Sequence, residues 1–174
     1  SNLPRAYNRF GTILAHIGLL DRAREMYERA AAFHPKKAVS HSIVQVYLWN
    51  EEYESARNEI QAWRTENPHN KYPIYFAPLL AMMVEDWKET KTLLDDAAQL
   101  LPDEPLIISL QGLYCALTGN REQALQCLTQ ACTYPKSFGH PHHVYYQLAY
   151  ILTVLGRHKN AFGGLGSRGK PGFA

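Results

Sequence analysis

The chain repeats an apolar pattern in which a small residue is flanked by larger residues at offsets of three and four. Such offsets place residues on one face of an α-helix. The small residue lets a neighbouring helix approach closely, and the larger residues fill the space beside it. The pattern predicts five helices. Their small positions are Gly11, Val44, Pro78, Gly112 and Ala149, each four residues after Tyr7, Ser40, Ile74, Ile108 and Tyr145 and three before Leu14, Tyr47, Ala81, Cys115 and Leu152.

A second pattern follows each of these helices. Small residues stand at Ala23, Ala56, Thr90, Ala124 and Ala161, which are 33, 34, 34 and 37 residues apart, and four positions later come Tyr27, Ile60, Leu94, Leu128 and Leu165. Each unit is therefore predicted to be a helix, a turn and a second helix. Because one such pair cannot bury its apolar face alone, the pairs are expected to stack. The prediction is an all-α, right-handed superhelical solenoid of antiparallel helix pairs, with units 4–35, 36–68, 69–102, 103–138 and 139–162.

Three segments depart from this regular pattern. Residues 163–174 contain five glycines and Pro171. In a helix interior each glycine costs about 1 kcal/mol and a proline about 3 kcal/mol, so we expect an irregular tail and an incomplete last pair. Pro78 predicts a kink in the first helix of unit three, or a helix that starts late after Pro73. The longer spacing before unit five predicts an extended loop in the stretch PKSFGHPHH.

The first unit carries the pattern most completely, at Tyr7, Phe10, Gly11, Leu14, Ala23, Tyr27, Ala30 and Pro35. It resembles the tetratricopeptide repeat family. Units two and three depart from the family pattern, because Val44 and Pro78 replace its glycine and Thr90 replaces an alanine. The stretch YPKSFGHPHHVYYQLAYIL (134–152) also resembles the last complete unit in C-terminal repeat regions of bacterial multidomain signalling proteins. That resemblance implies a regulatory part of a larger protein.

In this architecture the first helix of each unit lines the concave side, where the family binds a peptide or helix of a partner protein. A non-catalytic protein-interaction module is therefore expected. The alternative for each groove position is packing against the adjoining repeat, and the alternative function is self-association as a homodimer through the exposed last repeat. Counting from the small positions, the groove residues are Asn8, Thr12, His41, Gln45, Tyr72, Tyr75, Leu79, Met82, Ser109, Leu113, His143, Tyr146 and Tyr150.

Composition narrows the classes of partner. The chain of 174 residues is 46% hydrophobic and 20% charged, with a net charge of +2 that Arg168 and Lys170 in the tail supply. A nearly neutral body argues against a nucleic-acid partner, which requires a basic face. The longest apolar stretch, 72–84, is shorter than the roughly 20 residues of a membrane span. Three cysteines without a C-x-x-C motif suggest a reducing compartment, so a cytoplasmic location is expected, although a targeting segment before Ser1 could have been removed.

Candidate chemistry is weak throughout the sequence. Gly164, Gly169 and Lys170 match part of a phosphate-binding loop, but a helix precedes them and Pro171 stands where a serine or threonine would hold Mg²⁺. The cluster of His140, His142 and His143 near Cys127 and Cys132 raises the alternative of metal or small-ligand sensing. The two cysteines lie about 140° apart around a helix, so they diverge. We therefore expect no metal, no cofactor and no enzymatic activity.

Overall fold

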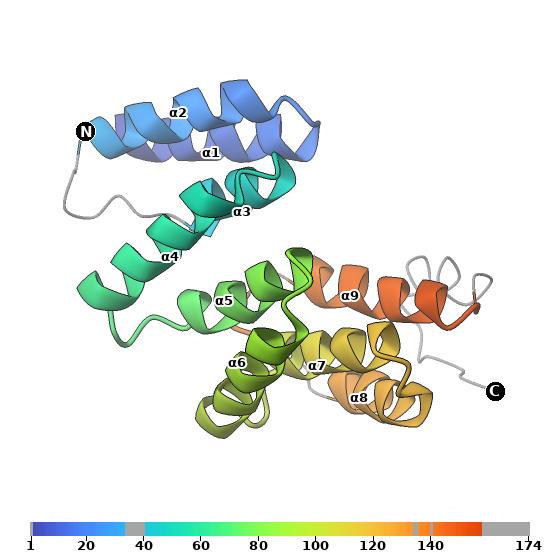
Figure 1. The fold of residues 1–174 in the computed structure, drawn as a ribbon. Coiled ribbons are helices and arrows are strands. Elements are labelled where there is room, and N and C mark those ends of the chain that lie inside the picture. Colours follow the sequence, from blue (N-terminus) through green and yellow to red (C-terminus); the bar gives the residue numbers. More distant parts are fainter. Residues whose placement is uncertain (1, 34–40, 134–135, 140, 158–174) are drawn as a thin grey trace. The chain divides into compact units, whose positions relative to one another are not determined.

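The computed structural model describes residues 2–33, 41–133, 136–139 and 141–157 (Figure 1). Across these ranges the chain forms helices and turns and contains no strand, as an all-α helical repeat solenoid requires. The helices are α1 (Leu3–His16), α2 (Leu20–Ala32), α3 (His41–Trp49), α4 (Tyr53–Glu66), α5 (Tyr72–Met83), α6 (Trp87–Leu100), α7 (Pro105–Leu117), α8 (Arg121–Thr133) and α9 (Pro141–Val154).

The helices form two compact bodies, an N-terminal body of residues 1–80 and a C-terminal body of residues 81–174, and α5 crosses the boundary. The division of the chain into five repeat units is not tested by this division into two bodies and stays a prediction. Some predictions concern positions outside the described residues. These positions are Pro35, Ser40, His140, Ala161, Leu165 and the whole of 163–174, with Gly164, Gly169, Lys170 and Pro171.

Four turns join the two helices of a predicted pair and a fifth turn follows α9, and all five have one geometry. The second residue after the end of each first helix has a positive φ: 81° at Gly18, 60° at Glu51, 59° at Glu85, 85° at Gly119 and 75° at Gly156. The next backbone N–H then donates to a carbonyl five residues earlier, as in Asn120 to Cys115 (2.8 Å) and Arg157 to Leu152 (2.7 Å). This left-handed cap ends each first helix and reverses the chain. The predicted turns are therefore present, including the one after α9.

The N-terminal body is built on the predicted small position of α1. A Cβ added to Gly11 would lie 2.8 Å from Tyr27 Cε1 of α2, so only glycine allows the two helices to pack this closely. Leu14, Ala23 and Met26 continue the buried core beside that contact. The chain continues by packing α2 against α3 and α3 against α4. The apolar periodicity of the sequence thus places the core of this body.

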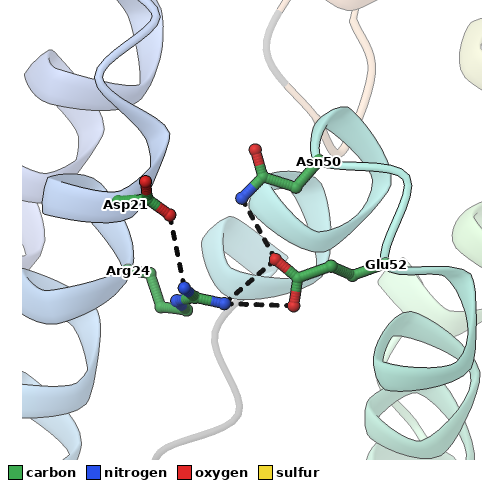
Figure 2. Close-up of polar contacts among 4 residues, drawn as sticks. All are labelled: Asp21, Arg24, Asn50 and Glu52. Carbon is green, nitrogen blue, oxygen red and sulfur yellow. Dashed lines mark hydrogen bonds and ion pairs between the residues drawn. The ribbon is translucent and has the colours of Figure 1, made fainter.

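A polar cluster joins α2 to the turn between α3 and α4 (Figure 2). Nη1 of Arg24 donates to both carboxylate oxygens of Glu52, at 2.9 and 3.0 Å, and Nη2 donates to Oδ1 of Asp21 at 3.3 Å. Nδ2 of Asn50 also donates to Glu52, at 3.1 Å. The side chains of Arg24 and Glu52 are 33% and 32% exposed, so the ion pair is partly shielded from water. No sequence pattern indicated this cluster, because its members do not share a helical face.

In the C-terminal body, α7 contacts α6, α8 and α9. A Cβ on Gly112 would lie 2.9 Å from Cys127 Cβ of α8 and 2.9 Å from Ile151 Cδ1 of α9, so the small position here admits two neighbouring helices at once. The predicted loop before unit five lies against the start of α7. The Glu104 carboxylate accepts from the Ser137 hydroxyl, from Phe138 N (3.3 Å) and from Leu106 N (3.3 Å).

Helix α5 begins at Tyr72, so the predicted late start after Pro73 is wrong, and the helix continues through Pro78. Its start is favourable because the Asn70 side chain accepts a hydrogen bond from Tyr72 N (3.0 Å). Pro73 follows at a position whose N–H would have no helical partner. Pro78 is fully buried, so the packing of its ring offsets the hydrogen bond that the helix loses there.

Candidate partner-binding surface

Helix α9 presents the most exposed aromatic surface among the predicted groove positions. Val144, Gln147, Leu148 and Ile151 are buried on one side of the helix, at the three- and four-residue spacing of an amphipathic helix. Tyr146 and Tyr150 are 60% and 52% exposed. They are one helical turn apart, so their rings project from the same side.

Two histidines extend this side of α9 toward its first turn. The rings of His142 and His143 lie 4.3 Å apart between centroids, and His142 meets the edge of Tyr146 at 5.7 Å. Residues 141–154 contain no aspartate, glutamate, lysine or arginine. The surface formed by His143, Tyr146 and Tyr150 is therefore aromatic and carries no fixed charge. We call it the α9 tyrosine surface.

The groove positions on α7 have a different environment. Ser109 and Leu113 are 0% and 4% exposed. The Ser109 hydroxyl is hydrogen-bonded to Oε1 of Gln147 on α9 and to the Leu106 carbonyl. Both residues therefore pack within the C-terminal body in this structure, as the alternative of packing against the adjoining repeat anticipates. Gln147, a buried polar residue on α9, was not indicated by the sequence pattern.

The groove positions on α5 are mostly covered as well. Tyr75 and Met82 are 4% and 5% exposed, whereas Tyr72 and Leu79 are half-buried. The Tyr72 ring stacks on Trp63, with centroids 5.8 Å apart, and burial raises the pKa of its hydroxyl. Of the four, Tyr72 and Leu79 keep side-chain surface that a partner could reach.

The N-terminal body presents polar groove positions on α1 and α3. Asn8 is exposed, and Thr12 and Gln45 are half-buried. The Thr12 hydroxyl donates to the Asn8 carbonyl (2.9 Å) and accepts from the Tyr27 hydroxyl (3.2 Å). His41 is the first residue of α3, and its side chain lies outside the described part of the structure. Asn8, Thr12 and Gln45 supply hydrogen-bonding groups and no aromatic surface.

The candidate metal cluster is described only in part, because His140 lies outside the described residues. Within the described ranges, no three histidine, cysteine, aspartate or glutamate side chains come together as metal ligands. Burial raises the pKa of the Cys115 and Cys127 thiols, which lowers the fraction of reactive thiolate at neutral pH. In the described part of the chain, no helix combines the length and apolar character needed to cross a membrane.

Comparison with known proteins finds one family match and several similar structures. The tetratricopeptide repeat family model matches residues 4–36. A thermophilic TPR protein of Thermus thermophilus has a similar structure, with a TM-score of 0.72 at 21% identity, covering 92% of this chain and 87% of that one. The APC/C hetero-tetramer Cut9–Hcn1 gives a TM-score of 0.71 at 13% identity, covering 92% of this chain and 32% of that one.

A third similar structure is YrrB, described as a TPR protein with an unusual peptide-binding site. Its TM-score is 0.51 at 19% identity, covering 91% of this chain and 81% of that chain. No curated protein sequence matches this chain. At these identities the structural matches establish the fold of the chain.

Proposed function

We propose, from the match of residues 4–36 to the tetratricopeptide repeat model and from the fold shared with tetratricopeptide repeat proteins, that the chain binds a peptide or helix of a partner protein through the α9 tyrosine surface. Proteins of this fold are generally non-catalytic interaction modules. The bound segment would lie along the exposed side of α9, in contact with His143, Tyr146 and Tyr150.

The exposure of Tyr146 and Tyr150 carries this proposal. Tyr146 and Tyr150 are each more than half exposed, whereas Val144, Leu148, Ile151 and Leu152 of the same helix are buried. Tyrosine offers a large contact area at low entropic cost, and its hydroxyl can form hydrogen bonds. Because α9 carries no fixed charge, an apolar or aromatic segment fits this surface better than an acidic one.

The other groove positions have supporting roles in this proposal. Asn8, Thr12, His41 and Gln45 would give the N-terminal body hydrogen-bonding contacts of its own. Tyr72 and Leu79 would offer it apolar contacts from α5. Tyr75, Met82, Ser109 and Leu113 are buried, so each would contribute to the packing of its own body and not to direct contact with a partner. The peptide-binding site of YrrB is a precedent for this use of the fold, and the module would serve as a regulatory part of a larger protein.

A direct test begins with the selection of peptides against the full chain from a displayed random library. The affinities of the selected peptides are then measured by titration calorimetry for the intact protein and for the Tyr146→Ala/Tyr150→Ala variant. We expect a loss of about tenfold or more, the size typical of removing aromatic anchors. Tyr145→Ala is the matched control, because Tyr145 is equally exposed on another side of α9. Equal affinity for the intact protein and the double variant would refute the proposed surface.

Self-association is the second candidate, and the uncharged, tyrosine-rich exposed surface of α9 favours it. Two copies could appose this helix without bringing like charges together. Sedimentation velocity over a range of concentrations tests this candidate. A monomer at every concentration would eliminate self-association and leave peptide binding in place.

A further inference from the structure

Tyr145 lies on a different side of α9 from the α9 tyrosine surface. The internal repeat shows what packs against the equivalent side of the first helix in other pairs. Each described second helix buries a seam of a small residue, a large residue four positions later and a third residue three positions beyond. The four seams, all buried, are Ala23, Tyr27 and Ala30 on α2; Ala56, Ile60 and Trp63 on α4; Thr90, Leu94 and Ala97 on α6; and Ala124, Leu128 and Ala131 on α8.

The matching positions of the first helices in the first, third and fourth pairs, Tyr7, Ile74 and Ile108, are half-buried or buried. Tyr7 of α1 is half-buried and stacks on Phe33 at the end of α2, with centroids 6.2 Å apart. Ile108 of α7 is 3% exposed, whereas Tyr145, at the same position of α9, is 54% exposed. Ala149 is also only half-buried, although Gly11 and Gly112 at the same small position are buried. The side of α9 that receives a second helix is thus left open by the described residues.

The turn after α9 has the geometry that introduces a second helix in the other pairs. Gly156 has a positive φ of 75°, and Arg157 N donates to the Leu152 carbonyl as in the four preceding turns. The sequence that follows suits a helix poorly, because residues 163–174 hold five glycines and Pro171. The Tyr145 side of α9, which would pack against a second helix, is therefore followed by a sequence, residues 163–174, that has a low helix propensity.

A recess lies next to Tyr145 where the start of α9 meets the end of α8 and the start of α7. It has a volume of about 80 Å³, and Ala131, Val144, Tyr145 and Leu148 are among its lining residues, together with Lys136. Val144 and Leu148 give the recess an apolar part, Lys136 and Ser137 give it a polar part, and α9 itself carries no fixed charge. The recess can receive a large apolar side chain from a helix that lies along this side of α9.

We propose that the Tyr145 side of α9 binds an amphipathic helix of a partner protein, which takes the place of a second helix in the fifth pair. The partner helix would present the seam that this chain uses itself: a small residue, a large apolar residue four positions later and a small residue three positions beyond. Its binding site continues the helix-pair interface that α1 forms with α2, α3 with α4 and α7 with α8. It lies on another side of α9 from the tyrosine surface, so it is independent of the function proposed above.

The probe is a fluorescein-labelled peptide of residues 87–100, which contains the seam Thr90, Leu94 and Ala97. Its binding to the full chain is measured by fluorescence anisotropy, with the same peptide carrying Leu94→Asp as the control. We expect the seam peptide to bind at least about tenfold more tightly than the control peptide. We expect Tyr145→Lys to weaken binding by about tenfold or more, whereas Tyr146→Lys leaves it unchanged.

Both tyrosines are more than half exposed, so either lysine variant should fold, and circular dichroism verifies this. Three results would overturn the inference: no binding to the full chain, binding that does not depend on Leu94, or an equal loss in both lysine variants. Peptide binding that appears only after truncation at Arg157 would show that residues 158–174 cover the site. A dimer that Tyr145→Lys dissociates in sedimentation velocity would show that a second copy covers it. Either of these two results also rejects a partner helix.

Discussion

The small position of α7 makes a sharp prediction about stability. In an unconstrained helix interior, Gly→Ala stabilises a protein by about 1 kcal/mol. At Gly112 the added Cβ would lie 2.9 Å from both Cys127 Cβ and Ile151 Cδ1. The Cys127 Cβ is attached directly to the α8 backbone, so it cannot turn away unless the helix moves. Overpacking of this kind costs about 1–3 kcal/mol.

The two contributions leave Gly112→Ala destabilised by about 0–2 kcal/mol, opposite in sign to the unconstrained case. Urea unfolding, with fluorescence and circular dichroism as coincident probes, measures this free energy. Ile151→Val removes the Cδ1 atom. Combining this substitution with Gly112→Ala should therefore recover the part of the lost free energy of unfolding that comes from the contact with α9. If Gly112→Ala instead stabilises the protein by about 1 kcal/mol, the close contact of α7 with α8 and α9 is incorrect.

Three further predictions follow from other parts of the structure. Gly119→Ala should cost about 1–2 kcal/mol in backbone strain, because φ at this position is 85°. The lower conformational entropy of the unfolded chain offsets part of this cost, and urea unfolding measures the net change in the free energy of unfolding. Arg24→Met should cost about 1 kcal/mol or less, and the difference from the intact protein should shrink in high salt, because Arg24 and Glu52 are partly exposed. Iodoacetamide should alkylate Cys127 in the native protein more slowly than in urea, because its pKa is raised by burial; equal rates would contradict this burial.

Much of the fold was accessible from the sequence because the repeated pattern reports on burial directly. The residues at the small positions and at the second-helix seams occupy the expected packing sites, such as Gly11 against Tyr27. The two glutamates with positive φ, Glu51 and Glu85, were less accessible because glycine is the residue that usually marks such a turn. The repeat imposed the same turn at these positions in spite of the residue type.

The binding surface could be predicted only in part. Counting along the helices placed Tyr146 and Tyr150 on the open side of α9, and the structure leaves both exposed. The same counting chose Ser109, which is buried and hydrogen-bonded to Gln147. Whether such a position is open depends on how neighbouring helices pack, and a one-dimensional pattern does not contain that information. The cluster of Arg24 and Glu52 was missed for the same reason.

The central claim is that the chain binds a partner protein through the α9 tyrosine surface. The most direct measurement is an affinity capture from lysate of the source cells, comparing the full chain with its Tyr146→Ala/Tyr150→Ala variant by quantitative mass spectrometry. We predict that a defined set of proteins is retained by the intact chain and depleted about tenfold or more with the variant. Identical sets of proteins from both forms would contradict the claim.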